Sequence, residues 1–245
     1  MYIQRTLHMK YAEKYAEEVA RFTKVTSHLA EKMYVTGYGG NAAWKLEDDL
    51  ILITPTKLNK GEITVDDLVF INRAGDTVEG TRRPTGERPM YLKLFEERPD
   101  IVSVLHCHAP NVGAFAIMDG SNLLMRPFYP ELAHEVGPVP VVPYAEPLTQ
   151  ELADNFSPFL QKYNSFLMEN HGLVTMSVKS IDYTMMNVDL LEMSAYSILQ
   201  ALATGRELKE LTREAIKGLD NVMKERNDPM FGAPGTYESL VELYF

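Results

Sequence analysis

Apolar positions recur with two different periods along the chain, and these periods predict a mixture of helices and strands. Between about residues 9 and 33, apolar side chains return every three or four positions with Glu and Lys between them, which predicts an amphipathic helix. This stripe consists of Tyr11, Tyr15, Val19, Phe22, Val25, Leu29 and Met33. The same period predicts a long helix from Ser180 to about Thr204, ended by Gly205, and a last helix from Leu208 to about Arg226.

Short apolar runs between turn-forming residues predict strands, which fall at 42–45, 50–54, 66–71, 77–80, 101–110, 136–144, 166–168 and 173–176. Shorter helices are predicted over about 86–98, 111–118 and 149–163, the first with Thr85 as its N-cap and Pro89 in its first turn. Consecutive strands are often too close in sequence for a parallel crossover. We therefore expect an α/β (α+β) fold, with a central, mostly antiparallel sheet flanked by helices. We expect it to form one domain over residues 1–245, with a tail from about 227 to 245.

Composition and charge narrow the class of protein. The 245 residues are 45% hydrophobic and 24% charged, an ordinary balance for a globular chain. The net charge of -10 argues against nucleic acid as the main partner, because phosphate backbones recruit basic surfaces. No apolar run approaches the roughly 20 residues of a membrane span, and the N-terminus lacks the apolar core of a signal peptide. The single cysteine, Cys107, excludes an internal disulfide and a cysteine-based zinc site, so we expect a cytoplasmic protein.

Two histidines on one predicted strand are the first candidate site. Side chains alternate between the faces of a strand, so His106 and His108 project from one face and Cys107 from the other. Such a pair suits a divalent metal, although two hydrogen-bonded core histidines would give the same pattern. His171 lies at a glycine-containing turn between two apolar strands and is the candidate third ligand. Three histidine ligands leave a coordination position open for water or substrate, which is typical of a catalytic site.

Glu87 is the candidate acid/base, because it is expected in the first turn of the helix that follows Thr85 and Gly86. The helix dipole favours its charged form and lowers its pKa, and a nearby metal would act in the same direction, whereas an apolar cleft would oppose both. An ordinary glutamate at a helix start is the structural alternative.

Three stretches could hold an anion. The turn at 39–41 offers backbone N–H groups, the stretch 54–57 adds hydroxyls and the cation of Lys57, and the helix start at 85–86 is a ready phosphate site. Each stretch also has a purely structural interpretation as a turn or a helix end.

Taken together, these motifs resemble the class II aldolase/adducin family, and in particular its L-fuculose-1-phosphate aldolase type. The resemblance covers roughly residues 10 to 205, and the motifs come in the family's order. They are Gly40-Asn41, Thr54-Pro55-Thr56, Pro84-Thr85-Gly86-Glu87, His106-Cys107-His108 and Asn170-His171-Gly172. Two positions depart from the family pattern: Lys57 stands where the family has glycine, and Gly86 where it has a second serine.

The resemblance implies a site and an assembly. The metal is expected on His106, His108 and His171; it is usually zinc, although imidazoles also accept Mn²⁺ or Co²⁺. Glu87 matches the catalytic glutamate. The substrate's anionic group is expected near Gly40, Asn41, Thr56, Lys57, Thr85 and Gly86. The family usually forms a four-fold symmetric homotetramer with active sites at subunit interfaces, where a neighbour supplies an aromatic hydroxyl. Tyr129 matches that hydroxyl by position, with Tyr237 and Tyr244 as alternatives.

The implied activity is a metal-dependent retro-aldol cleavage of a ketose phosphate, through an enediolate, to dihydroxyacetone phosphate and an aldehyde. A decarboxylase or dehydratase of a sugar acid or ketose phosphate would use the same site. A pentulose-phosphate 4-epimerase is a further alternative, although that branch typically has aspartate where Glu87 lies. A noncatalytic adducin-like scaffold module would have lost the histidines. The expected partner is therefore a small sugar phosphate or sugar acid.

Overall fold

The computed structural model describes residues 10–120 and 122–245, and it is built around an eight-stranded sheet. In spatial order the strands are β4 (Thr77–Glu79), β3 (Val69–Ile71), β2 (Leu50–Ile53), β1 (Asn41–Glu47), β5 (Ser103–Cys107), β8 (Gly172–Ser177), β7 (Ser165–Met168) and β6 (Val141–Val142). Neighbouring strands pair antiparallel, except that β6 runs parallel to β7. The expected mostly antiparallel sheet is confirmed.

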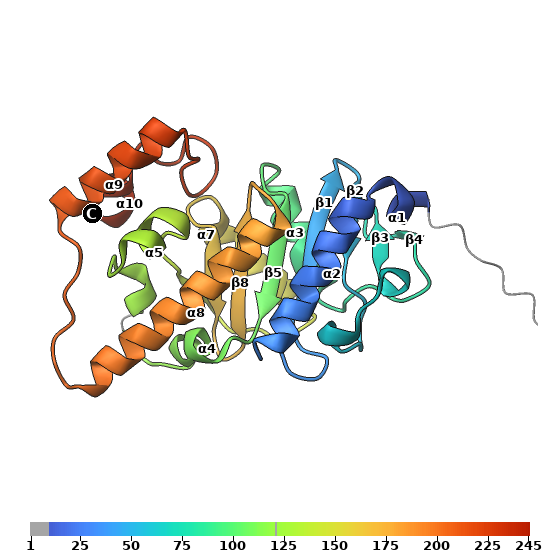
Figure 1. The fold of residues 1–245 in the computed structure, drawn as a ribbon, viewed down its shortest axis with the longest axis horizontal. Helices are drawn as coiled ribbons and strands as arrows, with labels where there is room; N and C mark the ends of the chain where they lie inside the picture. Colours follow the sequence, from blue (N-terminus) through green and yellow to red (C-terminus); the bar gives the residue numbers. More distant parts are fainter. Residues whose placement is uncertain (1–9, 121) are drawn as a thin grey trace, which may run out of the picture.

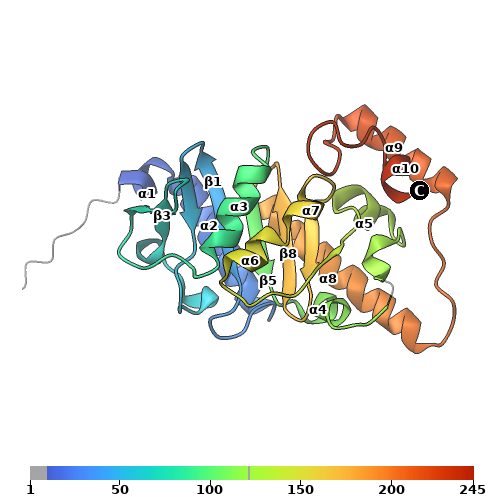
Figure 2. The same cartoon turned by 180° about the vertical axis from the view of Figure 1, so that it is seen from behind.

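Helices cover both faces of the sheet. The helices α2 (Ala16–Glu31), α4 (Pro110–Ala116) and α8 (Ile181–Ala203) lie on one face (Figure 1). The helices α3 (Arg88–Glu97), α6 (Gln150–Asp154) and α7 (Ser157–Leu160) lie on the other (Figure 2). Each layer has its own buried apolar cluster.

Strand alternation decides which layer each residue of β5 faces. Leu105 and Cys107 belong to the cluster under α2 and α8, whereas Val104 belongs to the cluster under α3. His106 therefore projects on the α3 side and Cys107 on the opposite side, as the sequence predicts. Burial raises the pKa of Cys107 to about 12, which keeps its thiol protonated.

Several predicted elements have different bounds. The first helix is divided into α1 (Lys10–Lys14) and α2, and residue 9 lies outside the described residues. The helix predicted over 149–163 is wrong: it is two short helices, because Pro158 lacks the N–H that a continuous helix needs. Of the extended stretch 136–144 only β6 pairs, since Pro138, Pro140 and Pro143 cannot donate to a ladder.

Capping side chains explain further shifts. The strand predicted over 66–71 begins only at Val69, because a capping box between Thr64 and Asp67 closes a 3-10 turn at Val65–Asp67. The last predicted helix begins at Arg213, because the side chain of Thr212 accepts the N–H of Ala215 as an N-cap.

The C-terminal segment forms a third apolar cluster beside the sheet. Helices α9 (Arg213–Arg226) and α10 (Leu240–Tyr244) pack against each other, and α9 packs against α5 (Pro130–Glu135), as Figure 1 shows. The buried members of the cluster are Ala133, Ile216, Met223, Phe231 and Leu240. The expected tail at 227–245 thus contains one helix and is held on the body of the protein. Within the described ranges, no helix is both long and apolar enough to cross a membrane.

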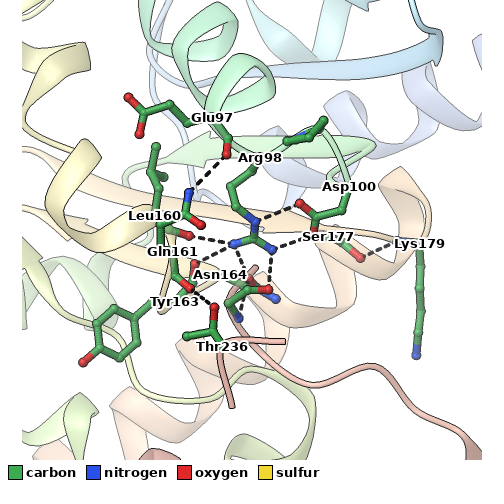
Figure 3. A network of polar contacts seen from close by, with 12 residues as sticks. Glu97, Arg98, Asp100, Leu160, Gln161, Tyr163, Asn164, Ser177, Lys179 and Thr236 are labelled. Carbon is green, nitrogen blue, oxygen red and sulfur yellow. Dashed lines mark hydrogen bonds and ion pairs between the residues drawn. The ribbon is translucent and has the colours of Figure 1, made fainter. Parts of the chain in front are cut away.

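A fully buried arginine ties this segment to the sheet layer (Figure 3). Arg98 follows the end of α3, and its guanidinium donates to both carboxylate oxygens of Asp100 at 2.9 and 2.7 Å. It also donates to the carbonyl of Leu160 at 2.8 Å, the amide oxygen of Asn164 at 3.0 Å and the carbonyl of Gly232 at 2.6 Å. One side chain therefore joins the α3–β5 connection, the end of α7, the α7–β7 connection and the C-terminal segment.

Candidate metal centre

Three histidines converge at the end of β5. His106 is fully buried, and its Nε2 lies 3.0 Å from Nε2 of His108. One ring nitrogen from each of His106, His108 and His171 lies within 4.8 Å of the other two. Among the described residues, these three form the one group of three or more His, Cys, Asp or Glu side chains with metal-ligand spacing.

Pairing between β5 and β8 brings the third histidine to the first two. His106 lies opposite Val174 and Cys107 opposite Leu173, so the turn before β8 faces the end of β5. Asn170 has a φ of 53°, in the left-handed region that Asn tolerates well, which lets the chain turn at His171. A Cβ at Gly172 would lie only 2.9 Å from Cδ2 of His108, so glycine is required for the rings to approach.

The histidines fit a divalent metal. Nδ1 of His106 lies 2.9 Å from the carbonyl oxygen of Leu173, and donation to that oxygen leaves Nε2 with a free lone pair. Burial, followed by the effect of His106, lowers the pKa of His108 and of His171 to about 4. Both rings are then neutral near pH 7, which is the form that binds metal. Three neutral imidazoles with converging nitrogens form a suitable donor set for zinc or a similar ion.

Glu87 faces this cluster. The carboxylate is 7% exposed, with Oε2 3.6 Å from Nε2 of His106 and Oε1 3.6 Å from Nε2 of His171. Nδ2 of Asn41 donates to Oε2 at 2.5 Å. Burial raises the pKa of Glu87, but the neighbouring imidazoles and the hydrogen bond from Asn41 together lower it by more, so the net direction is down. A carboxylate held ionised at this place is suited to proton transfer.

The expected position of Glu87 within the helix needs correction. It is the N-cap residue of α3, not a first-turn residue, because the helix begins at Arg88. The hydroxyl of Thr85 accepts the N–H of Glu87 at 3.3 Å, and the N–H of Arg88 bonds the Thr85 carbonyl at 3.2 Å. These contacts form a tight turn before the helical hydrogen-bond pattern starts. Pro89 lies in the first turn, as predicted.

Two loops bring most of the expected anion-binding residues together. The N–H of Thr56 donates to the carbonyl of Arg83, and the N–H of Thr85 donates to the carbonyl of Thr54, each at 3.0 Å. This pairing places the segment 54–57 beside the segment 83–86. Lys57 is exposed and has a φ of 54°, so it keeps a backbone conformation that favours glycine.

The remaining expected residues have specific packing. A Cβ on Gly86 would lie 3.0 Å from Cδ2 of Leu148, a half-exposed residue that covers it. A Cβ on Gly40 would lie 2.9 Å from the carbonyl oxygen of His106, so glycine is needed beside the histidine strand. Asn41 is buried, and its amide faces Glu87 and Tyr91. Its part in anion binding stays a prediction.

The tyrosines proposed for the neighbouring subunit's role lie away from the histidines of their own chain. Tyr129 is 37% exposed and precedes α5 as its N-cap residue, where it lines a surface hollow with Leu190 and Met193. Tyr244 packs beside the C-terminal cluster, and Tyr237 lies near Tyr163. A contribution from any of them to the metal centre requires a second subunit and stays a prediction.

Sequence reasoning missed two buried residues near the centre. Lys60 is 1% exposed and donates to the carbonyls of Tyr38 and Leu58, and burial lowers its pKa to about 8. No pattern around Lys60 indicated burial. Tyr91 is fully buried and contacts Asn41. Its position one helical turn after Glu87 was the available signal, because residues four apart share a helix face.

Comparisons with known proteins identify the family of the chain. A family profile for the Class II Aldolase and Adducin N-terminal domain matches residues 20–199. The chain therefore belongs to the class II aldolase and adducin family, as its motifs indicate.

The similar relatives carry out different reactions. The chain is 28% identical over 202 residues to a 3-oxo-tetronate 4-phosphate decarboxylase of Pectobacterium atrosepticum, which covers 82% of this chain and 91% of the relative. It is 31% identical over 175 residues to an L-fuculose phosphate aldolase of Methanococcus maripaludis. This match covers 71% of this chain and 92% of the relative.

Solved structures show the same fold. YgbL from Klebsiella pneumoniae superposes with a TM-score of 0.77 at 28% identity, covering 83% of this chain and 98% of that one. An L-fuculose 1-phosphate aldolase superposes with a TM-score of 0.75 at 26% identity. The superposition covers 85% of this chain and 96% of the aldolase chain. The sheet with its two helical layers is thus the class II aldolase fold.

Proposed function

We propose that the protein is a metal-dependent carbon–carbon lyase that cleaves a ketose phosphate by a retro-aldol reaction. The products would be dihydroxyacetone phosphate and an aldehyde. The observation that carries this proposal is the place of Glu87, whose two carboxylate oxygens lie 3.6 Å from Nε2 of His106 and of His171. An ionised carboxylate beside three converging imidazoles supplies both a metal site and a proton-transfer group.

In this proposal His106, His108 and His171 hold a divalent cation, Zn²⁺ first and Mn²⁺ or Co²⁺ as alternatives. When bound, the ion acts as a Lewis acid toward the substrate's carbonyl and hydroxyl oxygens. The carbon–carbon bond breaks as a base takes the proton of the aldehyde-side hydroxyl, and the bond's electrons pass into an enediolate. In the cleavage direction the Glu87 carboxylate first takes a proton from solvent and then gives it to the nucleophilic carbon; in the reverse direction the carboxylate removes that proton.

The base at the aldehyde side is proposed to come from a neighbouring subunit of a homotetramer, with Tyr129 as the candidate. Tyr129 is partly exposed before the first residue of α5 and lines a surface hollow, which supports a role between subunits. The substrate's anionic group is proposed to lie between the paired loops at Thr56, Lys57, Thr85 and Gly86. The hydroxyls of Thr56 and Thr85 and the ammonium of Lys57 suit a phosphate or a carboxylate.

Decarboxylation of an oxo-acid phosphate is the second candidate, and the match to a 3-oxo-tetronate 4-phosphate decarboxylase over 91% of that protein favours it. Loss of carbon dioxide beside a carbonyl also leaves an enediolate that needs a proton, so Glu87 would keep its role. The two reactions differ in the group that leaves. A scaffold role is disfavoured because the three histidines and Glu87 are all present and brought together.

Product identification tests the proposal. Metal-loaded protein is incubated with ketose 1-phosphates, ribulose 5-phosphate and 3-oxo-sugar-acid phosphates, and dihydroxyacetone phosphate and carbon dioxide are quantified. We expect dihydroxyacetone phosphate from a ketose 1-phosphate. Glu87→Gln should keep the metal, which metal analysis checks, and should lose at least about a hundredfold in turnover, as expected for a lost acid/base.

Release of carbon dioxide from a 3-oxo-sugar-acid phosphate, with no cleavage of any ketose 1-phosphate, would replace the retro-aldol reaction with decarboxylation. Epimerised pentulose phosphate without cleavage, or turnover by Glu87→Gln equal to that of the wild type, would contradict the proposed mechanism.

A further inference from the structure

A buried hydrogen-bond chain reaches Glu87 from inside the protein. The hydroxyl of Tyr91 lies 2.6 Å from Oδ1 of Asn41 and 2.8 Å from the Asn41 carbonyl oxygen. Nδ2 of Asn41 then donates to Oε2 of Glu87 at 2.5 Å. Tyr91 is fully buried, and Asn41 and Glu87 are 6% and 7% exposed, so water has little access to compete for these bonds.

This hydrogen-bond chain links α3 to β1, and β1 in turn pairs with β5. Tyr91 lies one turn after Glu87 on α3, and Asn41 is the first residue of β1, opposite His106 in the ladder between β1 and β5. A contact between Tyr91 and Asn41 therefore joins α3, whose N-cap is Glu87, to β1, which pairs with the strand that carries His106.

The donors and acceptors allow one orientation of the amide. Both oxygens of Asn41 can only accept, and the Tyr91 hydroxyl is the donor directed at them. A phenol hydroxyl carries its proton near neutral pH, so Tyr91 can act as this donor. With Oδ1 held by the tyrosine, Nδ2 must face Glu87. A rotated amide would instead place Oδ1 against the carboxylate, where two acceptors repel.

We propose that Tyr91 is a positioning residue for Glu87, which it orients through the side-chain amide of Asn41. This rests on the proposed function, in which Glu87 transfers the proton. Removing the tyrosine hydroxyl frees the amide to rotate and leaves the carboxylate without a fixed donor. The effect should appear in kcat and not in KM, because the Asn41 side-chain amide faces Glu87 and Tyr91, whereas the anionic group is proposed to lie between the loops at 54–57 and 83–86.

A double-mutant cycle on kcat tests the route of the effect. Tyr91→Phe is expected to lower kcat by about tenfold, the worth of one buried hydrogen bond, with KM within about twofold of wild type. In an Asn41→Ala background the same substitution should change kcat by less than about twofold, because the intermediary is gone. Tyr183→Phe is the matched control, since that hydroxyl donates to Glu135 away from the centre. Equal losses from Tyr91→Phe in both backgrounds would overturn the proposal.

A second readout does not depend on turnover. In protein labelled with ¹⁵N-asparagine, the side-chain amide signals that vanish in Asn41→Ala belong to Asn41. We expect Tyr91→Phe to shift these signals and to speed their hydrogen exchange at least about tenfold, whereas Tyr183→Phe leaves them unchanged. Unchanged Asn41 signals in Tyr91→Phe would overturn the proposal. If those signals respond but no compound in the panel is cleaved by wild type, the positioning contact stands and the proposed function fails.

Discussion

Lys57 holds a backbone conformation that usually belongs to glycine. Its φ of 54° costs about 1 kcal/mol for a residue with a Cβ, and the position is the one where the family pattern has glycine. Strained residues of this kind concentrate where a side chain has a function. The exposed ammonium beside the loop 83–86 supplies such a function if the substrate is anionic.

Replacing this lysine separates strain from binding. Lys57→Gly should raise KM for the anionic substrate at least about tenfold with little change in kcat, because a charge-assisted contact is lost in binding. Its thermal stability should stay equal or rise, since the left-handed strain is removed. Lys217→Ala, on the exposed side of α9, removes the same charge far from the loops and should leave KM unchanged. An unchanged KM in Lys57→Gly would place the anion site elsewhere.

Single residues were predictable where the signal was local. His106 was predictable because strand alternation needs only its own neighbours, and the glycine after His171 marks the turn that presents it. The strand predicted over 101–110 was too long, because β5 ends at Cys107 and His108 follows it directly. The contact of Asn41 with Glu87 and Tyr91 was not predictable. It depends on how β1 pairs with β5 and how α3 packs on them, which no local pattern contains.

At the scale of elements, the long amphipathic helices and the apolar strands were predicted well, and the errors occur at ends. Pro158 divides one predicted helix, and Thr212 delays the start of another. Glu87 moved from first turn to N-cap because Thr85 holds a tight turn before it. Each of these changes in an element's bounds is caused by one capping side chain or by one missing backbone N–H. That single group decides where the helix begins or ends, even where the apolar pattern continues.

Arg98 joins several of these element ends, and its removal should be costly. Arg98→Met leaves the carbonyls of Leu160 and Gly232 without their buried donor and the Asp100 carboxylate without its partner. We expect a loss of about 3–5 kcal/mol in the free energy of unfolding, measured by urea titration of metal-loaded protein.

Arg21→Met is the matched control, because Arg21 also pairs with a carboxylate, Asp182, but is half exposed. The free energy of unfolding of Arg21→Met should fall by no more than about 1 kcal/mol. Equal losses in the two variants would show that the buried network around Arg98 does not hold the C-terminal segment to the sheet layer.

At the scale of the whole molecule, the C-terminal segment is the part that the family does not explain. The family profile ends at residue 199, yet α9 packs on α5, the helix that follows Tyr129, and α10 packs on α9. The carbonyl of Gly232 in the same segment accepts from Arg98, at the C-terminal end of the helix whose N-cap is Glu87. The C-terminal segment therefore contacts α5 and the end of α3, the two helices whose N-cap residues are Tyr129 and Glu87.

The fold class was predictable because short connections between strands exclude most parallel arrangements. The strand order was not, since β5 pairs with β1 and β8, whose sequence positions lie on either side of it by more than fifty residues. The expected homotetramer stays a prediction.

The central claim is that three histidines, His106 near the end of β5, His108 directly after it and His171 in the β7–β8 turn, form a divalent metal site. Metal analysis of protein loaded with Zn²⁺ and then desalted tests it most directly. We predict about one ion per chain in wild type and far less in His108→Ala, because two imidazoles hold an ion less tightly than three. His28→Ala, which removes a histidine that pairs with Asp189 on the α2–α8 surface, should bind like wild type. Wild-type protein without bound metal, or undiminished binding in His108→Ala, would contradict the account.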